Sequence, residues 1–257
     1  MNQTNDSLHR VVSAYAAASE AMSAATTGRT RRGPEGALLA ISGAPIASMN
    51  GIISPTLAPN PQEIASLAAS ESPWELPWGI QVRGVPGRLV TKVAASYGLT
   101  QFNPSPLMLR RPEQGLPAEP SIDSFRVRAV AADELDLYAR TVAEGFETPH
   151  EMFHVLAEPA LARIEGMEFY LAELDGLPVG TGMTAISNDL TGIFNITTLP
   201  PYRRRGYGLA ITTEMVRAGF RADATTAYLY ASETGEPVYE SAGFRTEESL
   251  TVITAPS

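Results

Sequence analysis

The sequence has 257 residues, of which 44% are hydrophobic and 18% charged, and its formal net charge is -9. This is the composition of a globular chain that is long enough for one large or two small domains. The negative balance argues against a nucleic-acid-binding protein, because the chain as a whole would repel phosphate and attract cationic molecules instead.

Cysteine is absent, which excludes disulfides and a thiol nucleophile and fits a reducing compartment. Three histidines without ligand spacing do not support a metal site. No apolar run approaches the roughly 20 residues of a membrane span, and the N-terminus lacks a signal-like apolar core. We therefore expect a cytoplasmic protein without membrane partners.

The first half of the chain alternates helical and strand patterns. An amphipathic helix is predicted over 7–25, a loop over 26–36, and a hairpin or bulged strand over 37–53. The elements expected after these are a helix over 61–70 with Asn60 as cap, a strand over 78–83, a helix over 87–97 and a strand over 106–109.

Residues 111–121 (RPEQGLPAEPS) contain three prolines and one glycine and show no apolar periodicity. This composition predicts a linker between an N-terminal α/β domain, 1–110, and a second domain, 122–257.

The second half contains a longer series of alternating elements. The strands at 169–174 and 179–187 are expected to pair across the turn Asp175–Pro178. The other predicted elements are a strand at 125–130, helices at 132–146 and 148–156, a strand at 193–198, a helix from Leu209, a strand at 227–232, a helix at 236–241, and closing strands around Phe244 and 250–253.

A strand, loop and helix between Ile193 and Gly219 form the segment with the clearest chemistry. Arg203, Arg204 and Arg205 place three positive charges beside Gly206 and Gly208. The two glycines carry no Cβ that would keep a ligand away from the backbone N–H groups, and the loop opens a helix. These features favour the same ligand charge, so the segment predicts an anion site for a phosphate or pyrophosphate.

Two landmarks in this half carry a family resemblance. The pattern Arg203-x-x-Gly206-x-Gly208 resembles the pyrophosphate loop of the GNAT superfamily of acetyl-CoA-dependent N-acetyltransferases, and FNITTLPPYRRRGYG is similar to bacterial alanine acetyltransferases that modify ribosomal-protein N-termini. The strand 227–232 and the segment 237–244 follow at the distance that this family has. The alternative, a solvated arginine run followed by a helix that ends at a glycine, stays open.

The resemblance implies a GNAT fold, that is, an α/β (α+β) domain with a mixed, mostly antiparallel central sheet flanked by helices. The element order of the first half resembles a degenerate copy in a tandem GNAT protein, which has lost the cofactor site and helps to shape the substrate pocket. An unrelated α/β domain is the alternative.

For the chemistry, the resemblance implies that acetyl-CoA lies with its pantetheine along Ile196, Thr197 and Thr198. The pyrophosphate-binding residues implied are Arg203, Arg204, Arg205, Gly206, Tyr207, Gly208 and Leu209. The backbone N–H of Ile196 is expected to donate to the thioester oxygen, and Tyr239 to protonate the leaving sulfur. A packing role for Tyr239 above Phe244 is the alternative.

The general base does not follow the family pattern. Where the alanine acetyltransferases carry a Glu, this chain has Tyr230, and the following loop is shorter than theirs and lacks their Asn. Glu147 and His150 are the favoured candidates from a segment that also holds Glu144 and His154. Water as the base, and ordinary surface or capping roles for these side chains, stay open.

The function implied is an N-acetyltransferase that moves acetyl from acetyl-CoA to a primary amine of a small molecule or a peptide N-terminus by direct attack in a ternary complex. The alternatives are a non-catalytic acyl-CoA-binding sensor and, disfavoured by the charge, a nucleic-acid-binding module. The acceptor amine, the acyl-chain preference, a ligand of the first half and the oligomeric state, with a homodimer as one option, are not determined by the sequence.

Overall fold

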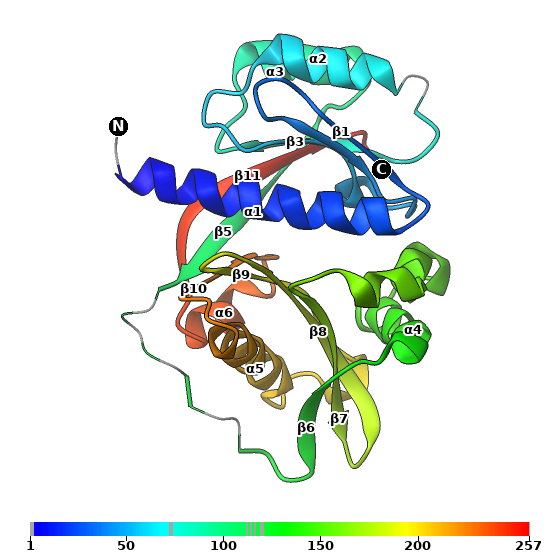
Figure 1. The fold of residues 1–257 in the computed structure, drawn as a ribbon, viewed down its shortest axis with the longest axis vertical. Helices are drawn as coiled ribbons and strands as arrows, with labels where there is room; N and C mark the ends of the chain where they lie inside the picture. The colour runs from blue at the N-terminus through cyan, green and yellow to red at the C-terminus, as the bar shows by residue number, and fades with distance from the viewer. Residues whose placement is uncertain are drawn as a thin grey trace. The chain divides into compact units, whose positions relative to one another are not determined.

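The computed structural model describes residues 3–71, 74–111, 113, 115, 117–118 and 121–256 (Figure 1). Two compact units divide the chain: unit 1 comprises Met1–Pro106 and Glu248–Ser257, and unit 2 comprises Leu107–Glu247. The predicted boundaries, 1–110 and 122–257, instead assign the C-terminal segment to the second domain. Five of the eleven residues of the predicted linker 111–121 lie outside the described residues, and the linker stays a prediction.

Unit 1 is a sheet covered on both faces, with α1 on one side and α2 and α3 on the other (Figure 1). Its strands follow the order β1-β2-β3-β4-β11. Its elements are α1 (Gln3–Ala25), β1 (Arg29–Arg32), β2 (Leu38–Ile41), η1 (Ala47–Met49), β3 (Asn50–Ser54), α2 (Pro61–Ser70), β4 (Gly79–Arg83), α3 (Arg88–Ser96) and most of β11 (Arg245–Thr254).

Three predictions for unit 1 can be compared directly with the structure. The hairpin is confirmed, because β2 and β3 pair antiparallel with Leu38 opposite Ile53. The cap is confirmed as well: the Asn60 side chain accepts hydrogen bonds from the N–H groups of Gln62 and Glu63 at the start of α2. The loop predicted over 26–36 is wrong, since Arg29–Arg32 form β1, where backbone pairing to β2 outweighs the low strand propensity of the segment.

In unit 2, α4 covers one face of the strands, and α5 and α6 cover the other (Figure 1). Residues 107–110 of β5 (Gln101–Arg110) begin the strand order β5-β10-β9-β8-β7-β6, in which only β9 and β10 are parallel. The elements are β6 (Phe125–Ala129), η3 (Ala132–Glu134), α4 (Leu135–Gly145), η4 (His150–Ala157), η5 (Pro159–Arg163), β7 (Met167–Leu174), β8 (Leu177–Ser187), β9 (Leu190–Thr198), η6 (Pro200–Tyr202), α5 (Tyr207–Arg221), β10 (Thr226–Tyr230) and α6 (Glu236–Ser241). The predicted mixed, mostly antiparallel α/β fold is thus confirmed.

Two details of unit 2 differ from the prediction. The expected closing strands around Phe244 and 250–253 are one strand, β11, which pairs with β4 of unit 1, and residues 107–110 of β5 supply the neighbour of β10 instead. The helix expected over 148–156 is the 3₁₀ segment η4, which is kinked at Phe153. Hydrophobic patterning along the chain does not specify which partner a strand takes.

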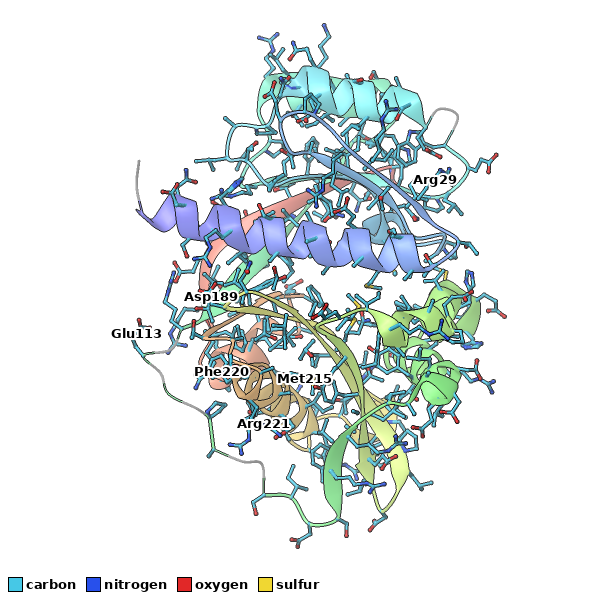
Figure 2. All side chains as sticks on the ribbon, viewed as in Figure 1. Arg29, Glu113, Asp189, Met215, Phe220 and Arg221 are labelled. Carbon is cyan, nitrogen blue, oxygen red and sulfur yellow. The ribbon has the colours of Figure 1, made fainter. Side chains whose placement is uncertain are left out.

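Helix α5 packs closely on β8. Met215, labelled on α5 in Figure 2, is fully buried. A Cβ at Gly182 of β8 would lie 2.8 Å from the Met215 sulfur. Gly182 therefore marks a close approach of helix and sheet that a larger residue would prevent. None of the helices that the structure describes has the length and hydrophobicity needed to cross a bilayer.

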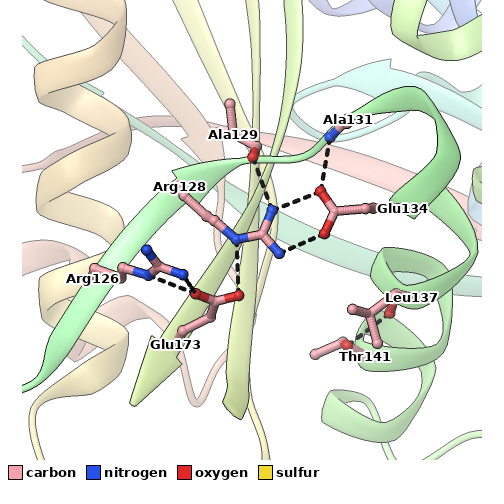
Figure 3. Close-up of polar contacts among 8 residues, drawn as sticks. All are labelled: Arg126, Arg128, Ala129, Ala131, Glu134, Leu137, Thr141 and Glu173. Carbon is pink, nitrogen blue, oxygen red and sulfur yellow. Dashed lines mark hydrogen bonds and ion pairs between the residues drawn. The ribbon is translucent and has the colours of Figure 1, made fainter. Parts of the chain in front are cut away.

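A charged network fastens the edge strand β6 (Figure 3). The buried Glu173 carboxylate accepts hydrogen bonds from Arg126 Nε at 2.7 Å and Arg128 Nε at 2.8 Å. Arg128 also donates to both oxygens of Glu134, and this hydrogen bonding lowers the pKa of the Glu134 carboxyl and raises that of Arg128. The network links the edge of the sheet to the segment that precedes α4, and its charges discourage pairing with another strand.

The buried ion pair of unit 1 generates a stability prediction. Arg83 on β4 is 1% exposed and forms a bidentate pair with Glu248 on β11, with an Nε–Oε1 distance of 2.7 Å. Glu248→Ala is expected to lower the free energy of unfolding by about 3–5 kcal/mol, because it leaves a buried guanidinium without its counter-charge. Urea denaturation measures this change.

Glu247→Ala provides the matched control at the adjacent position. Its partner Arg111 lies 3.2 Å away and both side chains are considerably exposed, so the expected loss is below about 1 kcal/mol. Equal losses in the two variants would contradict the prediction.

Candidate functional site

The strands β9 and β10 run together at one end and diverge at the other. They pair in parallel only over Leu190–Gly192 and Thr226–Tyr228 within the described residues. On its other side, β9 carries a bulge: two residues, Asn195 and Ile196, stand opposite the single Gly182 of β8. Asn195 has a φ of 50°, a conformation that asparagine tolerates better than most residues. The sequence did not predict this bulge.

A cleft of about 470 Å³ opens where the two strands separate. Its walls come from the end of α4, from β9, from the glycine-arginine loop (residues 203–208) and from the segment that follows β10. The lining residues are Gly145, Phe146, Glu147, Ile196, Thr197, Thr198, Arg203, Gly208, Ser232, Thr234, Gly235, Val238 and Tyr239. Predicted residues from four separate segments are thus brought to one cleft.

The end of α4 lies against β9 at Gly145 and Thr197. A Cβ at Gly145 would lie 2.4 Å from Thr197 Cβ, so only glycine fits there. Thr197 in turn shares a hydrogen bond of 2.8 Å with Thr181, whose hydroxyl donates to the Asn195 carbonyl oxygen at 2.7 Å. These contacts hold the bulge and the cleft wall together.

The glycine-arginine loop leads into α5 and forms one end of the cleft. Gly206 has a φ of 85° and occupies the N-cap position of α5, where no side chain accepts the helix N–H groups. Arg204 and Arg205 are exposed. The first turn of α5 therefore combines uncapped N–H groups, the positive end of the helix dipole and two exposed cations, which is a favourable environment for an anion.

The predicted residues of this loop differ in how they are placed. Arg203 and Gly208 line the cleft, whereas Arg204, Arg205 and Gly206 lie outside its lining. The Tyr207 ring is buried and stacks on Phe125, with 5.2 Å between ring centroids, which leaves its backbone as the part that could meet a ligand. Leu209 is 37% exposed and also lies outside the lining.

Tyr239 packs on Phe244, as the alternative expected, and it also lies in the cleft lining. Its ring packs edge-on to Phe244, with 6.3 Å between centroids, and against Gly235, while the same side chain lines the cleft. Burial raises the pKa of its hydroxyl to about 12, and no described residue hydrogen-bonds that hydroxyl. Tyr239 therefore carries a proton at neutral pH that is free to engage a bound molecule.

The residues considered for a base are not equivalent in the structure. Glu147 lines the cleft, but its carboxylate pairs with Arg203 at an NH1–Oε2 distance of 2.6 Å. His150 begins η4, and neither it nor Tyr230 is among the lining residues that the structure describes.

Several lining residues were not predicted from the sequence. The unpredicted lining residues reach the cleft only through tertiary packing: Gly145, Phe146, Ser232, Thr234, Gly235 and Val238. The available signals were the glycines at 145 and 235 and the cluster of small polar residues after β10. In the described residues, no group of three or more His, Cys, Asp or Glu side chains could hold a metal ion.

Comparison with solved structures identifies the fold. A GCN5-related N-acetyltransferase from Kribbella flavida matches with a TM-score of 0.69 and 17% identity, over 97% of this chain and 96% of that chain. A putative acetyltransferase of the GNAT family from Novosphingobium aromaticivorans matches with a TM-score of 0.54 and 16% identity, over 86% and 88% of the two chains. A GCN5-related N-acetyltransferase from Sphaerobacter thermophilus matches with a TM-score of 0.52 and 19% identity, over 74% and 63%. The fold is that of the GNAT enzymes.

The family comparison is more specific. Residues 134–244 match the model described as "Acetyltransferase (GNAT) family", so the chain contains a GNAT acetyltransferase domain. The match lies within unit 2 and includes every predicted site residue. No curated protein matches the chain.

The two loop glycines are expected to respond oppositely to alanine. Gly206→Ala places a Cβ on a residue with a φ of 85° and should lower the free energy of unfolding by about 1 kcal/mol. Gly208→Ala adds a Cβ within α5 at 3.5 Å from Thr198 Oγ1, an ordinary contact, and should leave stability unchanged or raise it by up to about 1 kcal/mol. Urea denaturation distinguishes them, and a loss as large at Gly208 as at Gly206 would contradict the assigned backbone conformations.

Proposed function

We propose that unit 2 is an N-acetyltransferase that moves acetyl from acetyl-CoA to a primary amine of a small molecule or a peptide N-terminus, by direct attack in a ternary complex. The observation that carries this proposal is the cleft between the diverging β9 and β10. It brings Ile196–Thr198, the glycine-arginine loop and Tyr239 into one site.

The residues present fit acetyl-CoA, which when bound supplies an activated acetyl thioester. Beyond the parallel pairing, β9 leaves a backbone edge along Ile196–Thr198 that can hydrogen-bond the amide groups of an extended pantetheine arm. The first turn of α5, with Arg204 and Arg205, suits the pyrophosphate. A cleft of about 470 Å³ lies in the size range of small-molecule sites.

Two groups of the chain are assigned to the transfer. The backbone N–H of Ile196, at the bulge, stabilises the negative charge that develops on the thioester oxygen. As the new C–N bond forms and the C–S bond breaks, Tyr239 donates its proton to the departing sulfur. Its raised pKa keeps the hydroxyl protonated and ready to donate.

The acceptor amine must lose a proton before or during the attack. Glu147 is engaged by Arg203, and His150 lies outside the described lining, so we assign this proton to water. An α-amine, with a pKa near 7.7–8.0, needs less help than a lysine amine with a pKa near 10.4. This favours acceptors of the first kind.

The second candidate function is a non-catalytic acyl-CoA-binding sensor. It is favoured by one observation: the cleft contains the cofactor-side residues, while the only carboxylate of its described lining is held in an ion pair. Turnover distinguishes the two, because a sensor would bind acetyl-CoA without releasing CoA in the presence of any amine.

The first experiment is isothermal titration with acetyl-CoA and with CoA. The wild type is expected to bind both, and the double variant Arg204→Glu, Gly206→Asp should weaken binding by at least about 100-fold, because it places carboxylates where the pyrophosphate would lie. Absence of binding by the wild type would refute the proposed function.

A control variant makes the same changes elsewhere in unit 2. Arg163→Glu, Gly176→Asp alters an exposed arginine and a glycine with a φ of 80° that, like Gly206, has open space for 4 Å around the point where a Cβ would lie. It should retain wild-type affinity. Equal losses in both double variants would indicate a general charge effect.

The second experiment tests Tyr239. Tyr239→Phe is expected to lower kcat by about 10²- to 10⁴-fold with an unchanged Kd for acetyl-CoA, measured as thiol release against a panel of amines. Because the pKa of Tyr239 is about 12, its deprotonation should not lower the wild-type rate between pH 7 and about 10. Tyr202→Phe, at a half-buried tyrosine outside the cleft lining, is the control. Wild-type kcat in Tyr239→Phe would refute the assignment.

A further inference from the structure

The backbone at Glu147 is unusual for a glutamate. The amide N–H of Glu147 donates to the Glu144 carbonyl oxygen, and that of Thr148 donates to the Ala143 carbonyl oxygen. This pattern is the Schellman ending of α4, in which Glu147 occupies the left-handed position that glycine normally takes. Its φ is 55°.

This conformation is rare for long side chains in the structure. Among the described non-glycine residues with positive φ, only Glu147 and Arg204 are neither Asn, Asp nor Ser. A long side chain in this conformation is unfavourable, because its Cβ approaches the carbonyl oxygen that follows it. Glu147 forms an ion pair with Arg203, and Arg204 follows Arg203 in the chain. Both residues with the unfavourable φ are therefore direct neighbours of Arg203.

Arg203 uses all three guanidinium nitrogens on protein acceptors. Nε donates to the Thr198 carbonyl oxygen at 3.1 Å, NH2 to the Gly145 carbonyl oxygen at 2.8 Å, and NH1 to Glu147 Oε2 at 2.6 Å. The Gly145 carbonyl is one of the last of α4 and has no partner within the helix, so the guanidinium also satisfies a helix end and complements its negative dipole. The Arg203 side chain thus connects the glycine-arginine loop to the end of β9 and to the end of α4.

We infer that Glu147 and Arg203 form a clamp that positions the glycine-arginine loop against α4, so that Glu147 is a positioning residue and not the base. In this arrangement the charge of Arg203 is neutralised by Glu147, and phosphate recognition falls to Arg204, Arg205 and the N–H groups of the α5 N-terminus. The inference deepens the proposed function and rests on it.

The clamp and plain electrostatics predict opposite signs for one substitution. Neutralising a carboxylate beside a polyanion site should tighten binding by Coulomb's law alone. If Glu147 instead orients Arg203 and the loop, Glu147→Gln should weaken acetyl-CoA binding, by about two- to tenfold. The direction of the change therefore separates positioning from charge.

Glu147→Gly tests whether weaker acetyl-CoA binding can occur without a loss of stability. Glycine relieves the left-handed strain, while the ion pair is exposed and contributes little to stability, since the side chains of Arg203 and Glu147 are 40% and 61% exposed. The variant is expected to melt at or above the wild-type temperature and still to bind acetyl-CoA about two- to tenfold more weakly. A merely structural role would not produce this combination.

The experiment is a double-mutant cycle on the whole chain. Kd values for acetyl-CoA are measured by isothermal titration for the wild type, Glu147→Gln, Arg203→Gln and the double variant. Asp136→Asn, which neutralises an exposed ion pair of α4 with Arg140, is the control and should keep the wild-type Kd. Hydrogen exchange of the Phe146–Thr148 amides without ligand should be faster in Glu147→Gln and unchanged in Asp136→Asn.

The clamp predicts that Glu147→Gln has no further effect once Arg203 is replaced. Tighter or unchanged binding by Glu147→Gln would overturn the inference, as would additive effects in the double variant. A lowered kcat with an unchanged Kd would also overturn it and would return Glu147 to the role of a base. If the wild type binds no acetyl-CoA, the proposed function fails; if it binds and the cycle shows no coupling, only the clamp fails.

Discussion

The separation of β9 and β10 is the constraint on which the site depends. Two parallel strands that stayed paired would satisfy each other's backbone groups and leave no room for a ligand. The bulge at Asn195 bends β9 away after Gly192, and the contacts of Thr181 and Thr197 hold it there. On the side toward β10, the backbone of Ile196–Thr198 then faces a cleft instead of a neighbouring strand, and the shape of this cleft follows from a single inserted residue.

Other features of unit 2 support this separation. Gly145 lets α4 approach the bulged strand, and Gly182 lets α5 approach β8 directly opposite the bulge. Because each glycine has no side chain at the point where a helix meets a strand, helices can pack against both faces of the sheet beside the cleft. The loop glycines, Gly206 and Gly208, serve a different purpose, since one provides the left-handed turn into α5 and the other opens the cleft wall.

Sequence patterning predicted most elements and part of the cleft lining, and the reasons for its failures are physical. Helical period and the Asn60 cap located α2, and the alternation of apolar residues located β7 and β8, because these signals are local. The pairing of β11 with β4, and of residues 107–110 with β10, is decided by tertiary contacts that no local pattern encodes. The strand Arg29–Arg32 was missed because its pairing outweighs its composition. The sequence does not predict the positive φ of Glu147 either, because the left-handed position at a helix end is normally taken by glycine.

The three consecutive arginines illustrate what sequence alone leaves equivalent. Arg203, Arg204 and Arg205 carry the same charge, so their charge alone would assign all three to binding the anion. Hydrogen bonds distinguish one of these three exposed arginines: Arg203 donates to two carbonyl oxygens and a carboxylate, while Arg204 differs in its backbone conformation, with a φ of 63°. A guanidinium whose donors are already used by the protein has fewer to offer a phosphate. In the proposed site, Arg203 thus helps to build the cleft while Arg204 and Arg205 are left to attract the ligand, and the ion pair with Glu147 makes that division.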